Sequence, residues 1–197
     1  MTRPLHRREV ARVLLEGRKD LLVVAGLGAP AWDITAAGDH PLSFPMWGAM
    51  GGAAMIGLGL ALAQPRKKVL VVTGDGEMLM GIGSLATIAV MKPRNLSVVV
   101  LDNERYGETG MQETHTGHGV NLAGMAKAAG FARTLAVTTA PQLRQLKRRI
   151  YAGEGPLFAQ VKVDPEKLPL VLPPREGSYI KNRFRLALLG PEAVHDE

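Results

Sequence analysis

Two polar residues, Asp75 and Asn103, each follow a hydrophobic run and offer oxygen atoms to a cation. Asp75 comes after the run Val69–Thr73, and Asn103 comes 28 positions later, after the run Leu96–Leu101. Because the ends of neighbouring parallel strands lie about 5 Å apart, both side chains can reach one ion. Mg²⁺ prefers oxygen ligands of this kind and shares its coordination with substrate phosphates. The pair therefore predicts a magnesium site.

Two glycines, Gly74 and Gly76, flank the carboxylate of Asp75 and let the backbone there adopt unusual angles. Backbone N–H groups in such a segment can approach a diphosphate. Asp-Gly pairs are also common in turns, so the glycines alone indicate little. Their place after one strand, with Asn103 at the end of the next, favours a phosphate and metal site over an ordinary turn.

Short apolar runs rich in Val and Leu alternate with helical segments, which is typical of an open parallel sheet. We expect strands at Leu21–Ala25, Val69–Thr73, Leu96–Leu101, Thr134–Val137 and Leu157–Val163. We expect helices at Gly51–Ala63, Ser84–Met91, Leu122–Ala129, Gln142–Tyr151 and Lys181–Leu189. The predicted fold class is therefore α/β, an open and mainly parallel sheet with helices on both faces. Ligands bind such sheets outside the carboxyl ends of the strands.

The length of 197 residues suits one domain with terminal arms. We expect an N-terminal arm or helix over residues 1–20, the sheet domain over 21–165, and a proline-rich, basic arm over 166–197. The formal net charge of +6 is dispersed along the chain, without the basic and aromatic clusters of a nucleic-acid surface. The absence of cysteine excludes disulfides and thiolate metal sites.

One segment, residues 41–65, carries no charged side chain and requires a membrane check. Its prolines and glycines favour a small-residue helix packed on the sheet over a membrane span. The N-terminus is polar and mixed in charge, unlike a signal peptide, so we expect a cytoplasmic protein that does not enter a membrane.

The motif from Gly74 to Asn103 resembles the signature of thiamine-diphosphate-dependent enzymes. That signature normally ends in Asn-Asn, whereas Asp102 occupies the first of the two positions here. A second block, Trp47-Gly48-Ala49-Met50-Gly51, is similar to a segment of the decarboxylases in this superfamily. The resemblance covers about residues 20–165 and identifies this region with the diphosphate-binding (PP) domain. It is strongest to the β subunits of sulfopyruvate decarboxylases and to the phosphonopyruvate decarboxylases.

The resemblance implies roles for individual residues around bound thiamine diphosphate and Mg²⁺. The Gly48 carbonyl would receive the 4′-amino group of the cofactor, and Met50 would support its bent shape. The metal would be held by Asp75, Asn103 and the carbonyl oxygen of Arg105. The cofactor's diphosphate would be lined by Gly74, Gly76, Glu77 and Tyr106.

Substrate contacts are also implied, in the segment that follows Asn103. Thr109 stands where some superfamily decarboxylases carry a glutamate, and a neutral residue there suits an anionic 2-oxoacid such as a sulfonate or phosphonate. Arg105, Gln112 and His115 are the nearest side chains in sequence to bind its charge. For His115 and His118 an ordinary solvated loop is an equally good interpretation.

Thiamine catalysis needs a glutamate on the pyrimidine ring, which the family takes from a separate pyrimidine-binding (Pyr) domain. This chain has room only for the PP half, so a Pyr-domain (α) subunit is the expected partner in a hetero-oligomer. The expected function is the β subunit of a 2-oxoacid decarboxylase. The alternatives are an acetolactate-synthase-like carboligase subunit and a non-catalytic cofactor-binding module.

A nicotinamide-binding oxidoreductase is a further alternative. Residues 26–31 fit the pattern G-x-G-x-x-G/A after a strand. However, no acidic residue ends a second strand about 20 residues later, as the dinucleotide fingerprint requires. We therefore expect a plain strand-to-loop turn at this position.

Overall fold

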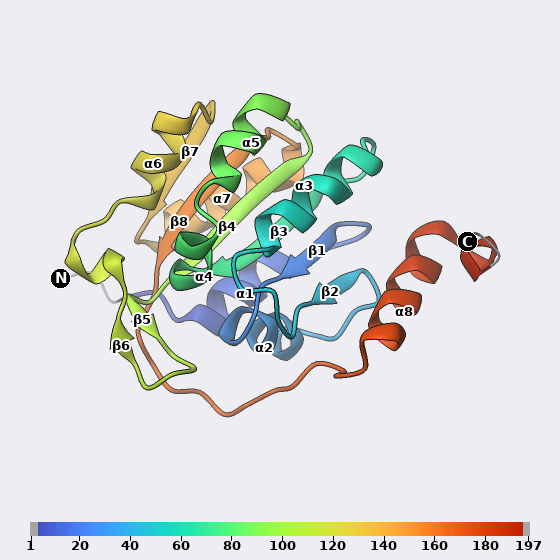
Figure 1. Cartoon of the computed structure of the whole chain (residues 1–197), viewed down its shortest axis with the longest axis horizontal. Helices are drawn as coiled ribbons and strands as arrows, with labels where there is room; N and C mark the ends of the chain where they lie inside the picture. The colour runs from blue at the N-terminus through green and yellow to red at the C-terminus, as the bar shows by residue number, and fades with distance from the viewer. Residues whose placement is uncertain (1–3, 195–197) are drawn as a thin grey trace.

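Six parallel strands form the central sheet in the order β2-β1-β3-β4-β8-β7 (Figure 1). Their bounds in this computed structural model are Leu22–Ala25 (β1), Ser43–Pro45 (β2), Val69–Gly74 (β3), Leu96–Asp102 (β4), Arg133–Val137 (β7) and Leu157–Lys162 (β8). The structure describes residues 4–194, so the outermost ends of the two predicted arms, 1–3 and 195–197, lie outside the described residues. The five strands expected from the sequence are present, and the α/β class is confirmed.

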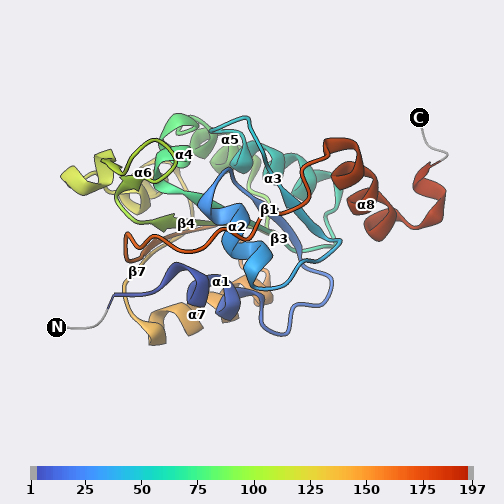
Figure 2. The ribbon, with the colours of Figure 1, turned by 90° about the horizontal axis from the view of Figure 1, so that it is seen from below.

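Helices cover both faces of the sheet (Figure 2). One face packs against α3 (Ala53–Ala63), α4 (Asp75–Met80), α5 (Ser84–Met91) and α6 (Leu122–Ala129). The other packs against α1 (Arg7–Leu15), α2 (Ala29–Ala36) and α7 (Ala140–Ala152). Because the central strands are apolar on both sides, the sheet carries two hydrophobic cores, one beneath each helical layer.

Several elements differ from the expectation, and each has a local cause. Residues 29–36 form helix α2 where a turn was expected; Gly28 precedes it with a φ of 77°, and Pro30 lies in its first turn. Strand β2 was missed because prolines surround it, and an edge strand tolerates them. The short helix α4, which begins at Asp75, was not among the expected helices.

The charge-free segment 41–65 contains β2 and α3, and α3 packs on the sheet as expected. Gly57 in α3 lies against Val71 of β3 so closely that a Cβ atom would overlap the valine side chain. Within residues 4–194, no helix has the length and apolarity needed to cross a bilayer.

The chain beyond β8 leaves the body and returns at its far edge. Residues 165–176 are extended, and α8 (Gly177–Leu189) and the short helix η2 (Pro191–Val194) stand beside β2 (Figure 1). Phe184 of α8 packs edge-to-face on Phe44 with ring centroids 5.7 Å apart. Arg183 pairs with Asp39 at 2.6 Å. The helix expected at Lys181–Leu189 is therefore present and begins four residues earlier.

Candidate active site

A cavity of about 200 Å³ opens at the carboxyl ends of β1, β3 and β4. The loops after β1 and β3 lead to helices on opposite faces of the sheet, which leaves a crevice between them. The predicted residues that line this cavity are Met50, Gly74, Asp75, Gly76, Glu77, Asn103, Arg105, Tyr106 and Thr109. Gly48, Gln112 and His115, which were also expected at the site, lie outside that lining.

Asp75 is buried at the start of α4, beside the end of β4. The hydroxyl of Thr114 donates to its Oδ2 atom, and Thr116 Oγ1 lies 3.0 Å from the same oxygen. Burial raises the pKa of Asp75, the hydroxyl bonds oppose that rise, and the nearby charge of Asp102 adds to it. Within the described residues, its Oδ1 atom receives no side-chain hydrogen bond, which leaves that oxygen for a ligand in the cavity.

Asn103 follows β4 and turns its side chain back on the chain. Its Oδ1 atom accepts the backbone N–H of Arg105 at 3.0 Å, which fixes the amide beside the cavity. Gly76 lies directly under the ring of Tyr106, where a Cβ atom would come within 2.5 Å of the ring. A side chain at position 76 would therefore displace Tyr106, whereas glycine lets both residues line the cavity.

These donors fit a magnesium and diphosphate site by their chemistry. In the described part of the chain, no three His, Asp or Glu side chains gather as a metal cluster. A cation here would instead be held by one carboxylate, one amide oxygen, backbone oxygen and ligand oxygens. Mg²⁺ is commonly bound in this manner, with few protein carboxylates and with substrate phosphates completing its shell.

Asp102, the departure from the family signature, is fully buried and has several partners. Its carboxylate accepts Thr116 Oγ1 at 2.7 Å and Gln160 Nε2 at 2.6 Å. Lys162 Nζ lies 2.8 Å from Oδ2 and supplies the compensating charge. Because β8 lies next to β4, both Gln160 and Lys162 reach the carboxylate from the neighbouring strand. The aspartate is therefore accommodated by a pair of polar residues on β8.

Glu77 lines the cavity but directs its carboxylate into the protein. Thr73 Oγ1 donates to Oε2 at 2.7 Å. Burial raises the pKa of Glu77, and the hydroxyl of Thr73 and nearby backbone N–H groups oppose that rise. A Cβ atom at Gly26 would overlap this carboxylate, so the first loop of the site needs glycine there. The carboxylate thus ties the loop after β1 to α4.

The segment containing Gly48 and Met50 lies above the cavity. Met50 lines the cavity and is partly exposed, while the Trp47 indole donates to the carbonyl oxygen of Pro174 at 2.6 Å. On the other side of this segment, the backbone of Gly51 packs against the backbone of Gly81. A Cβ atom at either position would come too close to the backbone of the other glycine. The C-terminal arm and α4 therefore hold this segment from two sides.

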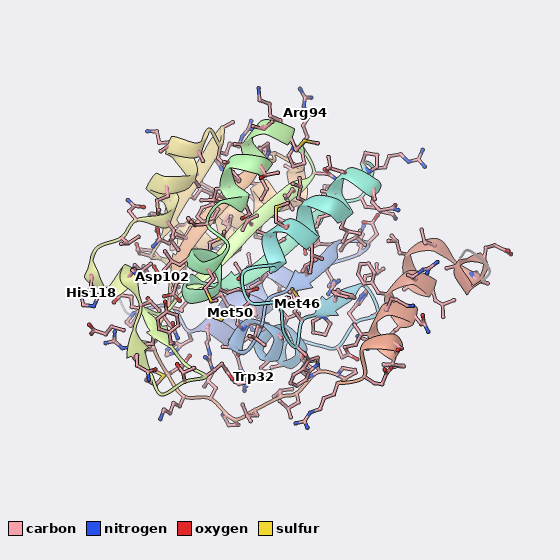
Figure 3. All side chains as sticks on the ribbon, viewed as in Figure 1. Trp32, Met46, Met50, Arg94, Asp102 and His118 are labelled. Atoms are coloured by element: carbon pink, nitrogen blue, oxygen red, sulfur yellow. The ribbon has the colours of Figure 1, made fainter. Side chains whose placement is uncertain are left out.

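The residues after Asn103 form a small hairpin, β5 (Arg105–Tyr106) and β6 (Gln112–Glu113), followed by the short helix η1 (His115–His118). Thr109 bonds to Gln112 at 2.9 Å. The Arg105 guanidinium pairs with Glu113 at 3.1 Å. His118 also faces Glu113, and Figure 3 shows it at the outer side of the molecule, away from Met50. His115 is exposed in η1 and not part of the cavity wall.

Two charged residues of the cavity were not among the predicted site residues, Arg7 and Glu108. Arg7 begins α1, within residues 1–20, where we expected an arm or helix without a part in the site. An isolated β-bridge between Leu5 and Val163 brings that segment to the end of β8. No local pattern signals this placement, because the bridge joins residues 158 positions apart.

A comparison with family models gives one match. The C-terminal TPP-binding domain of thiamine pyrophosphate enzymes matches residues 29–161. This chain belongs to that family. The assignment confirms the resemblance, and the matched residues include the carboxyl ends of β3 and β4, where Asp75 and Asn103 lie.

Curated relatives of this thiamine pyrophosphate enzyme domain include subunits and longer chains. Sulfopyruvate decarboxylase subunit beta of Methanocaldococcus jannaschii is 46% identical over 114 residues, 58% of this chain and 60% of that subunit. The subunit of the same name from Methanothermobacter thermautotrophicus is 38% identical, covering 84% of this chain and 86% of its own length. Phosphonopyruvate decarboxylase of Streptomyces viridochromogenes is 36% identical over 97% of this chain. The match covers 48% of the length of that decarboxylase.

Solved structures of thiamine enzymes share the fold. Benzoylformate decarboxylase from Polynucleobacter necessarius superposes with a TM-score of 0.71 at 22% identity, covering 85% of this chain. The 4-hydroxybenzoylformate decarboxylase of Rhodococcus jostii gives a TM-score of 0.69 at 18% identity over 84% of it. This chain spans 34% of each of those proteins.

Proposed function

We propose that this chain is the PP-domain (β) subunit of a thiamine-diphosphate- and Mg²⁺-dependent 2-oxoacid decarboxylase. The observation that carries the proposal is the common cavity lined by Asp75, Gly76 and Asn103 at adjacent strand ends. The family assignment supports the cofactor, and the names of the relatives support the reaction.

The residues of this chain would bind and orient the cofactor. Asp75, Asn103 and the Arg105 carbonyl would hold Mg²⁺, and the backbone at Gly76, which lines the cavity, would approach the diphosphate. Met50 would support the bent cofactor from above. When bound, thiamine diphosphate supplies a carbanion and an electron sink for the loss of CO₂.

A second subunit would complete the site. The name "subunit beta" in two relatives supports a partner, and we assign to it the Pyr domain and its activating glutamate. The loop before α3 and the helices α3, α4 and α5 on one side of the sheet leave large apolar side chains exposed, and such a partner could cover part of them: Met50, Met55, Ile56, Met80, Val90 and Met91.

The substrate would be an anionic 2-oxoacid, with a sulfonate or phosphonate as its second charged group. The curated names of the relatives support this class. Thr109 lines the cavity without adding a negative charge, which also suits such a substrate.

The proposal is tested by calorimetric titration of thiamine diphosphate, with and without Mg²⁺, into the chain reconstituted with its Pyr-type partner. Asp75→Ala and Asn103→Ala should each abolish the magnesium-dependent binding while leaving the circular dichroism spectrum unchanged. Asp20→Ala is the control, because Asp20 is exposed and pairs with Lys67 far from the cavity. Undiminished affinity in both site variants would refute the proposal.

Activity separates the decarboxylase from its nearest alternative. The large subunit of Escherichia coli acetolactate synthase isozyme 1 is 30% identical over 68% of this chain, so a carboligase has some support. Release of CO₂ from sulfopyruvate or phosphonopyruvate, without acetolactate formed from pyruvate, is the expected result. Acetolactate formation alone would favour the carboligase.

A further inference from the structure

Arg7 is a buried cation at the wall of the cavity. Its side chain is only 9% exposed, yet the residue lines the cavity together with Leu27, Pro30 and Val163. Helix α1 begins at Arg7, and the bridge between Leu5 and Val163 fixes this end of the helix beside the strand ends. The position of Arg7 is therefore fixed by the contact of this segment with the sheet.

One carboxylate orients this arginine. Arg7 Nε lies 3.1 Å from Oδ2 of Asp33, a fully buried residue of α2. Arg8 Nε binds the other oxygen of the same carboxylate at 3.2 Å. Two arginines thus share one aspartate, so Asp33 does not fully offset the charge of Arg7.

Among residues 4–194, Asp33 is the one ion-pair partner that the structure gives Arg7, and it lies only on the Nε side. Nε itself is buried and makes no hydrogen bond of good geometry with that carboxylate. The two terminal nitrogens carry four N–H donors, and the described residues offer them no hydrogen-bond acceptor, so they are available to a ligand in the cavity. Guanidinium donors in this arrangement match the oxygens of carboxylate, phosphate and sulfonate groups in bidentate pairs.

Glu108 is the closest competitor for these donors. Its carboxylate folds back over Gly28, where a Cβ atom would come within 2.9 Å of Oε1. Burial raises the pKa of Glu108, and the positive charge of Arg7 opposes that rise. Glu108 sits in a loop between the two short strands of the hairpin, so an incoming anion can displace it.

We propose that Arg7, oriented by Asp33, is an oxyanion-binding residue of this cavity. Its terminal nitrogens receive an oxyanion of the bound ligands, either the diphosphate of the cofactor or the second anionic group of the substrate. The identity of these ligands rests on the proposed function, whereas the binding of an oxyanion by Arg7 does not.

The test is calorimetric titration of two probes into the purified chain: inorganic pyrophosphate with Mg²⁺, and sulfoacetate. Arg7→Gln should weaken at least one of them by about 10- to 150-fold, the loss expected for charge-assisted hydrogen bonds. Arg7→Lys should recover part of the affinity, because it keeps the charge and loses the planar fork. Arg12→Gln, on the same helix but 66% exposed, should leave both affinities unchanged.

The two probes distinguish the sources of the oxyanion. A loss confined to pyrophosphate assigns Arg7 to the cofactor, and a loss confined to sulfoacetate assigns it to the substrate. Glu108→Gln keeps Arg7 and Asp33 intact and should strengthen binding of the affected probe, which guards against a folding defect in the arginine variants. No saturable binding of either probe to the wild-type chain, or equal binding by wild type and Arg7→Gln, would overturn the proposal. Since no turnover is measured, this outcome is independent of the decarboxylase assay.

Discussion

At the scale of single residues, the site depends on carboxylates that are buried for different reasons. Asp75 keeps one oxygen for the cavity, Asp102 is compensated by Lys162, and Glu77 joins α4 to Thr73. Similar side chains in one small region therefore differ in role according to the donors around them.

The carboxylate of Glu77 gives a prediction about pH. Because its pKa is raised by burial, the folded state binds more protons than the unfolded state above the ordinary glutamate pKa of about 4.3. The contribution of Glu77 to the free energy of unfolding should therefore fall as pH rises through this window. Glu77→Gln does not ionise, so its stability relative to wild type should improve from pH 4.5 to pH 7, measured by urea unfolding. Glu9→Gln on the exposed side of α1 is the control, and parallel curves for wild type and Glu77→Gln would contradict this account.

Residue-level prediction from the sequence succeeded where the signal was local. Asp75 and Asn103 are recognisable because each follows a readable strand, and the parallel pairing of β3 and β4 is confirmed. The partners of Asp102 lie about 60 positions away on β8, and Arg7 reaches the cavity through a bridge to that strand. Such contacts depend on strand order, which apolar runs alone do not determine.

At the scale of elements, α3 shows how small residues set the distance between a helix and the sheet. Gly57 faces β3 and leaves no room for a methyl group beside Val71, whereas Gly59 has no atom within 4 Å of the place of a Cβ. Two glycines in one helix therefore have opposite requirements.

This difference gives a paired prediction. Gly57→Ala should lower the free energy of unfolding by about 1–3 kcal/mol, because it overpacks the interface. Gly59→Ala should raise it by about 0.5–1 kcal/mol, because alanine is the better helix former at an open position. Urea unfolding of both variants against wild type is the measurement. Stabilisation by both substitutions would show that α3 does not pack on β3 at Gly57.

The elements missed from the sequence share a physical explanation. Strand β2 and helix α2 lie in a stretch rich in glycine and proline, where local preferences favour turns. Tertiary pairing with β1 and packing beneath the sheet decide those segments instead. The long apolar elements were predictable because burial on both faces leaves a continuous pattern.

At the scale of the whole molecule, the C-terminal arm connects distant parts of the fold. It leaves β8 and ends in α8 beside β2 (Figure 1). On the way, the carbonyl oxygen of Pro169 accepts a hydrogen bond from the Arg8 guanidinium, and the carbonyl oxygen of Pro174 accepts one from the Trp47 indole. Arg175 also lies over the Trp47 ring, 5.5 Å from its centroid. The prolines predicted an extended arm, but not the surface that it crosses.

We predict that the arm protects the edge of the sheet next to the site. Phe184→Ala removes the buried contact with Phe44, so amide hydrogen exchange should accelerate in β2 and in residues 46–50, while the central strand β4 keeps its protection. Leu189→Ala, at an exposed position of the same helix, is the matched control. Unchanged exchange in β2 would mean that α8 does not hold this edge.

The contact between Gly51 and Gly81 has a consequence for protein engineering. The two backbones touch, so neither position accepts a side chain unless the other segment moves as well. A combinatorial library that varies either residue alone would be filled with poorly packed members, and paired variation would be needed to explore this part of sequence space. Gly83 follows Gly81 closely and has open space around it, which makes it a place where chemical diversity can be introduced one residue at a time.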